Sequence, residues 1–159
     1  MCNLQYQINF KEVFGYFLHD VSVKKQIVKN IDSLLNQRSK YLMMITGSEE
    51  SDKTALVKDM ALFFFQTGKL ESTKVAKIKG DKLNTVNIMS KKETLVDCCL
   101  VVENASDLHQ ETIDGLLDLV SEMDGDIAVI FEDNMNNMNE LFRECPKLMD
   151  LLKNHINLS

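Results

Sequence analysis

The sequence has few of the residues that break or cross-link a chain. It contains one proline, six glycines and four cysteines in 159 residues. With so few chain breakers, hydrophobic periodicity becomes the main guide to its helices and strands. Cys98 and Cys99 are adjacent, whereas Cys2 and Cys145 stand alone, so no CxxC pair points to zinc or redox chemistry. We therefore expect reduced thiols in a cytoplasmic protein without a disulfide framework.

Long apolar runs and a surplus of positive charge are also missing. No apolar stretch approaches the roughly 18 residues of a membrane-spanning helix. Residues 1–10 do not join a cationic segment to an apolar one, as a signal peptide would. The formal net charge of -6 argues against nucleic acid or an anionic membrane as a partner. His19, His109 and His155 lie far apart with no second ligand at metal spacing, so we expect no metal site.

The composition that remains is that of an ordinary globular domain. Hydrophobic residues make up 45% and charged residues 26% of the chain. The length of 159 residues predicts a single domain, which we divide into an N-terminal segment, 1–20, and a core, 21–159.

Helical and strand-like segments alternate along the chain. Strands are expected, three of them fully buried, at 41–46, 74–79, 98–103, 127–131 and 155–158. Helices are expected after an N-cap at Ser22, from Thr54 to Thr67 before a C-cap at Gly68, within 82–97, from near Ser106 or Asp107 to Gly125, and before Pro146. This alternation predicts an α/β fold with a parallel sheet of about five strands flanked by helices.

Residues 47–54 follow the first buried strand and read Gly-Ser-Glu-Glu-Ser-Asp-Lys-Thr. Ligands of such sheets bind at the carboxyl ends of the strands, so this loop is the first candidate site. The P-loop, which binds phosphate, has the pattern G-x-x-x-x-G-K-[ST]. Gly47, Lys53 and Thr54 fit it, while Asp52 stands where the second glycine belongs. These residues and Ser51 form a candidate, degenerate site for ATP or ADP with Mg²⁺.

The charge of this loop opposes phosphate binding. Glu49, Glu50 and Asp52 against Lys53 leave a formal charge of about -2, whereas a phosphate cradle presents positive potential. A carboxylate about 4 Å from a phosphate oxygen costs on the order of 4 kcal/mol at an effective dielectric of about 20. Three interpretations stay open: Asp52 or Ser51 caps a helix that starts at Lys53 and replaces the phosphate, nucleotide binds weakly without hydrolysis, or hydrolysis is retained.

Over nearly its whole length the chain resembles the large subdomain of an AAA+ ATPase, in the group of the stage V sporulation protein K and the red-type rubisco activases. Residues 21–38 are similar to that family's leading helix. Residues 100–108 resemble its Walker B strand and the following turn, and 111–117 the next helix. Residues 126–138 resemble the fourth strand with sensor 1, and 139–158 the closing helices and fifth strand. The resemblance implies a P-loop NTPase fold of the AAA+ type.

The departures from the family pattern lie at its catalytic positions. The Walker B strand of the family ends in Asp-Glu, and the corresponding residues here look like Glu103 and Asn104. Glu103 could still approach Mg²⁺, but an asparagine cannot activate water as a base. Asn134 is the sensor-1 candidate, and a polar helix cap explains it equally well. The arginine-finger positions fall near Met149 and Leu151, which carry no charge.

These departures favour a degenerate AAA+ domain, a pseudo-ATPase with nucleotide binding weak or lost and no catalytic residue. Such a domain would be a non-hydrolysing assembly or regulatory module whose partner is a protein, for example a related AAA+ domain. The alternative is an ATP-binding AAA+ ATPase or remodelling domain with unusual motifs, completed by a neighbouring chain or a missing lid. The sequence ends where the family's helical lid would begin, so we expect a large subdomain without the lid.

Overall fold

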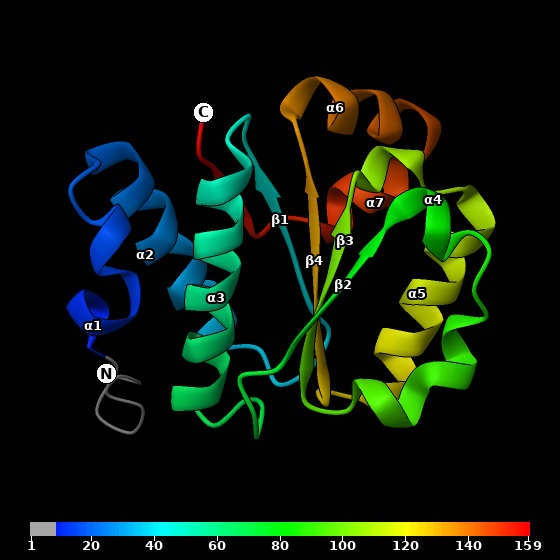
Figure 1. Ribbon diagram of the computed structural model, residues 1–159, viewed down its shortest axis with the longest axis horizontal. Helices are drawn as coiled ribbons and strands as arrows, with labels where there is room; N and C mark the ends of the chain where they lie inside the picture. The colour runs from blue at the N-terminus through cyan, green and yellow to red at the C-terminus, as the bar shows by residue number, and fades with distance from the viewer. Residues whose placement is uncertain (1–8) are drawn as a thin grey trace.

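The computed structural model describes residues 9–159 and shows a five-stranded parallel sheet between two layers of helices (Figure 1). The strands are β1 (Tyr41–Thr46), β2 (Val75–Lys79), β3 (Cys98–Glu103), β4 (Ile127–Asp133) and β5 (His155–Asn157). Their order across the sheet is β2-β3-β4-β1-β5, and every pair is parallel. The α/β class and the five strands predicted from the sequence are confirmed.

The helices divide between the two faces of this sheet. One face carries α1 (Phe10–Phe14), the 3₁₀ helix η2 (Gly15–Phe17), α2 (Val21–Leu35) and α3 (Glu50–Gln66). The other carries α4 (Gly80–Leu83), the 3₁₀ helices η3 (Ile88–Leu95) and η4 (Ala105–Asp107), α5 (Gln110–Met123), α6 (Met135–Glu144) and α7 (Pro146–Leu151). Figure 1 shows the two groups on opposite sides of the strands.

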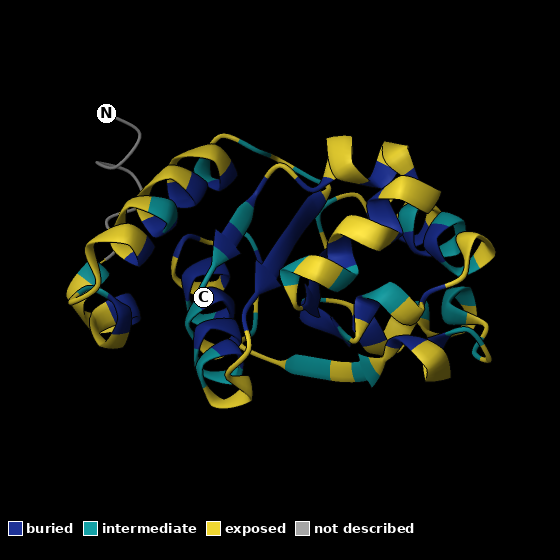
Figure 2. Cartoon of the chain, turned by 90° about the horizontal axis from the view of Figure 1, so that it is seen from above, coloured by how far each residue is buried: buried dark blue, intermediate teal, exposed yellow. Residues whose placement is uncertain are grey.

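Each face of the sheet has its own hydrophobic core because the central strands are covered on both sides. Alternate residues of β1 go to opposite cores: Met43 and Ile45 pack under α2 and α3, while Leu42 and Met44 pack under α5 and α6. Every residue of β1 and β4 is buried, whereas β2 at one edge is partly exposed (Figure 2). This double burial explains the continuous apolar runs in the sequence.

The carboxyl ends of all five strands meet at one edge of the sheet, which is uppermost in Figure 1. β1 continues into α3 on one face, while its neighbour β4 continues into α6 on the other. Connections that leave in opposite directions open a crevice between the two strand ends, and α/β proteins bind ligands in such a crevice. The candidate P-loop and Walker B residues all lie at this edge.

Two predicted helix starts were wrong. Asp20, not Ser22, caps α2, because its carboxylate accepts a hydrogen bond from the Val23 N–H at 3.1 Å. The helix expected from Ser106 or Asp107 starts instead at Gln110, after both residues have formed η4. Local capping preferences placed these boundaries within a few residues but did not identify the side chain that the tertiary structure uses.

Other boundaries also moved. Residues 82–97 were expected to hold one short helix, and they contain the end of α4 and the whole of η3. The strand predicted to end at Phe131 runs two residues further and carries Glu132 and Asp133 into the carboxyl edge. Thr67, not Gly68, is the C-cap of α3, and Gly68 follows with a φ of 75° in the left-handed region that glycine tolerates.

Three of the four cysteines lie within the described residues. Cys98, Cys99 and Cys145 are buried free thiols, and Cys2 lies outside the described residues. None of the helices among residues 9–159 is long and apolar enough to cross a membrane.

Candidate functional site

The connection between β1 and α3 is too short to be a P-loop. Only residues 47–49 lie between the last residue of β1 and Glu50, the first residue of α3. The Lys53 N–H donates to the Glu49 carbonyl at 3.2 Å, so residues 50–54 turn as a helix. No glycine interrupts residues 48–67, and Glu50 and Asp52 suit the positive end of the helix dipole. The helix predicted from Thr54 therefore starts four residues earlier.

This early start separates the side chains that the P-loop pattern grouped. Asp52 turns away from the cleft and accepts a hydrogen bond from the Tyr16 hydroxyl at 3.1 Å. Thr54 turns toward β2, where the Lys77 ammonium donates to its hydroxyl at 3.3 Å. Of Asp52, Lys53 and Thr54, only Lys53 lines the cavity at the strand ends, and it is buried there.

Neither Asp52 nor Ser51 caps α3, which corrects that interpretation of the loop. The N-cap is Glu49, and its side chain makes no capping hydrogen bond. Ser51 is exposed, and Asp52 is already paired with Tyr16. In the first turn, the Oε2 of the Glu50 carboxylate lies 3.6 Å from the Lys53 ammonium.

Gly47 packs closely against the segment that follows β5. A Cβ at this position would lie 3.2 Å from the Leu158 Cβ. The Leu158 N–H donates to the Thr46 carbonyl at 2.8 Å, which holds the segment after β5 beside the end of β1. The glycine of the pattern therefore has a packing explanation that involves no phosphate.

The Walker B positions do lie at the carboxyl edge. Glu103 is the last residue of β3, and Asn104 follows it with a φ of 50°, a left-handed conformation that asparagine accepts more readily than most residues. The Asn104 carbonyl approaches Gly80 so closely that a Cβ there would lie 2.6 Å from its oxygen. This close approach fixes the turn in which Asn104 sits.

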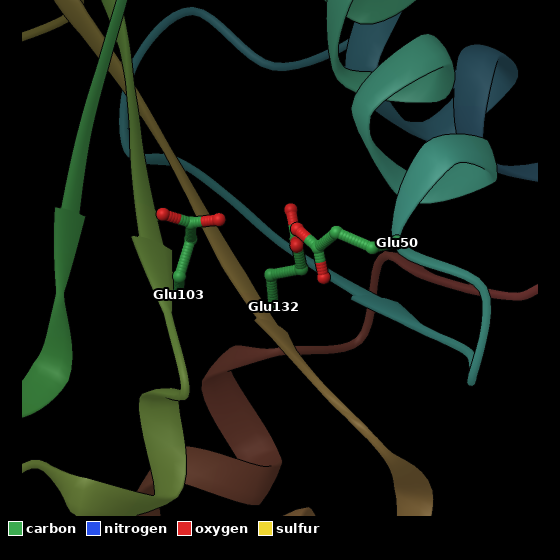
Figure 3. A group of neighbouring side chains, drawn as sticks. All are labelled: Glu50, Glu103 and Glu132. Atoms are coloured by element: carbon green, nitrogen blue, oxygen red, sulfur yellow. The ribbon is translucent and has the colours of Figure 1, made fainter.

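Three glutamates from three elements converge at this edge. Glu50 begins α3, Glu103 ends β3, and Glu132 is the penultimate residue of β4; one carboxylate oxygen of each lies within 4.8 Å of the other two (Figure 3). Glu132 is only 1% exposed, and its Oε2 has no hydrogen-bond partner. With Lys53, Lys79 and Asn104 they line a cavity of about 300 Å³.

The pKa values of two of these carboxyls shift in opposite directions. Burial, followed by the charge of Glu50, raises the pKa of Glu132 to about 7. Burial also acts to raise the pKa of Glu50, but a hydrogen bond with Glu132 and the positive charge of Lys53 outweigh it and lower that pKa. Close to neutral pH the pair therefore holds one shared proton for part of the time, mainly on Glu132.

Asp133 anchors the loops around the cavity. Its carboxylate accepts hydrogen bonds from the backbone and hydroxyl of Ser106, the backbone of Asn134 and the side chain of Asn137, at 2.7 to 3.0 Å. Burial acts to raise the pKa of Asp133, but these donors prevail and lower it. The Asn134 side chain accepts from the Asn137 N–H at 2.8 Å, so the residue proposed for sensor 1 caps α6.

Comparison with known proteins supports the fold and little else. No protein-family model matches the chain, and no curated protein matches its sequence. Among solved structures it is similar to the P-loop NTPase domain of the sigma-54 transport activator from E. coli, with a TM-score of 0.62 over 84% of this chain and 94% of that one. The chain has the fold of a P-loop NTPase domain.

At 11% sequence identity this likeness concerns the fold alone. The five-stranded parallel sheet is consistent with the large subdomain of an AAA+ protein, as the sequence resemblance implied. The chemistry of the cleft depends on the side chains that line it.

Sequence reasoning missed two residues of the cavity, Glu132 and Lys79, and the anchor Asp133. A signal for two of them existed, because Glu132 and Asp133 directly follow a buried apolar run at 127–131. Acidic residues at the end of a buried parallel strand lie at the ligand-binding edge of the sheet. The predicted strand end at Phe131 left them in a loop and concealed this.

Proposed function

We propose that this domain keeps the P-loop NTPase fold without binding or hydrolysing nucleotide, and that it acts as a protein-interaction module of assembly or regulation. The observation that carries the proposal is the cleft: α3 starts at Glu50, and the Glu50 and Glu132 carboxylates stand beside Lys53. A nucleotide phosphate needs free backbone N–H groups and positive potential at this place. The cleft instead holds three carboxylates, and residues 50–54 of the P-loop pattern belong to α3.

The hydrolytic groups are also absent from the matching positions. Asn104 stands where the family resemblance places the residue that activates water, and an amide is not a base at neutral pH. Met149 and Leu151, near the arginine-finger positions, are about half exposed on α7. Exposed apolar side chains suit contact with another protein, in line with a related AAA+ domain as partner.

The closer likeness to the stage V sporulation protein K and red-type rubisco activase group, and a cytoplasmic location, belong to the same proposal. They rest on the sequence resemblance and on the thiols Cys98, Cys99 and Cys145. The competing function is an ATP-binding AAA+ domain completed by a neighbouring chain or a missing lid. It is favoured by the two lysines, Lys53 and Lys79, that line the cavity.

Thermal unfolding with millimolar ATP or ADP plus Mg²⁺, compared with Mg²⁺ alone, separates these functions. A ligand at about 100 times its Kd would raise stability by about 2.7 kcal/mol and Tm by about 5–10 °C. We expect no nucleotide-dependent shift for the natural chain. A reproducible shift that depends on nucleotide would contradict the proposal.

A paired variant sharpens the test. Asp52→Gly with Asn104→Glu restores the glycine of the P-loop pattern and the glutamate of the Walker B pattern. We expect it to stay without ATP binding or turnover, because Asp52 points to Tyr16 and the cleft carboxylates remain. Recovery of ATP turnover would instead identify a decayed ATPase site.

A further inference from the structure

We propose that Glu50, Glu103 and Glu132 form a binding site for a hard divalent cation, and that the site fills without nucleotide. One carboxylate oxygen of each residue lies within 4.8 Å of the other two. Three oxygens about 4.8 Å apart each lie about 2.8 Å from the point between them, so side-chain shifts of a few tenths of an ångström bring all three to the roughly 2.4 Å of a calcium ligand. Figure 3 shows the three side chains entering the same space from α3, β3 and β4.

The buried, unpartnered oxygen of Glu132 points independently to a missing ligand. Glu132 is 1% exposed, and its Oε2 has no hydrogen-bond partner. The Glu132 side chain lines the same cavity as Glu50 and Glu103. A buried polar atom without a partner is costly, and native proteins leave few of them unless an ion or water completes the site. Nearby Asp133, by contrast, is fully occupied by N–H and O–H donors.

The charge balance of the cavity favours a doubly charged cation. Once the ion displaces the proton that Glu132 holds for part of the time near neutral pH, three ionised carboxylates against the buried ammonium of Lys53 leave a formal charge of -2. Lys53 lies 3.6 Å from Glu50 and neutralises that side of the cluster only. One divalent ion would cancel the remainder, and Lys79 is exposed and free to turn outward.

The donor set identifies the class of ion. All three groups are carboxylates, which bind Ca²⁺, Mg²⁺ and Mn²⁺ and lack the nitrogen and sulfur that zinc prefers. Water or the Asn104 side chain, which lines the same cavity, would complete the coordination sphere. The Glu50 side chain is 63% exposed, so an ion can enter from solvent.

This inference uses the same cavity as the proposed function but does not depend on it. Metal binding is measured without nucleotide, and nucleotide binding is judged against Mg²⁺ alone. A chain that binds the ion and no nucleotide supports both proposals, whereas one that binds nucleotide and no free ion contradicts both. Either proposal can therefore fail without the other.

The test is a titration of the full chain, stripped with EDTA, with Mn²⁺ followed by electron paramagnetic resonance and with Ca²⁺ or Mg²⁺ followed by calorimetry. We expect one Mn²⁺ per chain, with a Kd between about 1 μM and 1 mM. Glu132→Gln keeps the shape of the side chain and removes one charge, and we expect it to weaken binding about tenfold or more. Glu103→Gln should do the same.

The matched control is Glu49→Gln, an exposed neighbour whose side chain makes no capping hydrogen bond. It removes the same charge one residue before the cluster and should leave the Kd within about twofold, because exposed charges are screened by water. Circular dichroism identifies variants that fail to fold. If Glu132→Gln fails to fold, Glu103→Gln replaces it in the test, because Glu103 is less buried. No saturable binding below about 5 mM ion, or equal binding by both cluster variants, would overturn the proposal.

Discussion

At the scale of the residue, Glu132 is the unusual group of this domain. It is a carboxyl placed among apolar strands and next to two further carboxylates. Burying a charge is unfavourable unless a partner neutralises it, and burial therefore raises the pKa of Glu132 to about 7. A residue with this cost and no structural hydrogen bond at Oε2 is a strong candidate for a functional group.

We predict that Glu132 makes the metal-free protein less stable as the pH rises from 5 to 8. The folded state holds this proton up to about pH 7, whereas the unfolded chain loses it near pH 4.5, so ionisation opposes folding across that window. Glu132→Gln should remove this loss of stability with rising pH and raise the free energy of unfolding at pH 8 by about 1–2 kcal/mol. This gain is smaller than the whole pKa shift corresponds to, because water at the cavity mouth screens the charges.

Urea unfolding at several pH values in EDTA measures this effect. Glu50, Glu103 and Lys53 face Glu132, and the lowered pKa of Glu50 acts in the window below pH 4.5. The difference between the natural chain and Glu132→Gln cancels the titration of groups elsewhere, such as His155. Parallel stability curves for the two proteins between pH 5 and 8 would show the prediction to be wrong.

At the scale of the element, α2 completes the sheet by covering the free edge of β5. The Gln26 side chain donates to the Asn157 carbonyl at 3.0 Å and accepts from its N–H at 2.6 Å. The Asn30 side chain donates to the His155 carbonyl at 3.0 Å. Two amide side chains on successive turns of α2 thereby make the backbone hydrogen bonds that a neighbouring strand would make to β5.

We predict that Gln26→Ala and Asn30→Ala each lower the free energy of unfolding by about 1–2 kcal/mol, because each leaves backbone groups of β5 without their partner. Lys29→Ala on the same helix is the matched control, since Lys29 is exposed and alanine favours a helix. Urea denaturation measures all three. A loss no larger than that of the control would show that the edge of β5 needs no cover.

The start of α3 shows how an element boundary changes a site. The sequence of residues 47–54 is compatible with two structures, a P-loop and a helix with an acidic first turn. The pattern alone does not distinguish them. Without a second glycine, the helix gains backbone hydrogen bonds from Lys53 onward. The Tyr16 hydroxyl then holds Asp52, and the segment loses the shape that surrounds a phosphate.

At the scale of the whole molecule, the N-terminal helices are part of the core on one face. Val13, Phe14 and Phe17 are buried with residues of α2 and α3, and the Phe14 ring lies 6.5 Å from that of Phe63. They cover the side of α3 that faces away from the sheet. Among the three consecutive phenylalanines of α3, Phe65 alone is exposed, at 46%.

We predict that residues 21–159 without this cover melt at least about 10 °C below the full chain, because a buried phenylalanine is worth about 3–5 kcal/mol. Phe14→Ala should reproduce much of the loss, while Lys11→Ala at an exposed position of α1 should not. Calorimetry provides the comparison. Equal melting temperatures for the long and short chains would contradict a structural role for α1 and η2.

The sequence by itself determined the fold class, the five strands and the edge at which a site would form. These follow from local periodicity, since a strand buried on both faces must be apolar along nearly its whole length, as β1 and β3 are up to their last residues. Lys53, Glu103 and Asn104 line one cavity at that edge because parallel strands bring their carboxyl ends together.

Only the tertiary structure decided what the cleft contains. Glu50, Glu103 and Glu132 are far apart in the chain, and their meeting depends on the strand order and on the exact turn at which α3 begins. A helix end can shift by a few residues at little local cost, yet each residue turns a side chain by about 100° around the helix axis. That rotation turned Asp52 and Thr54 out of the site and left Glu50 and Lys53 inside it.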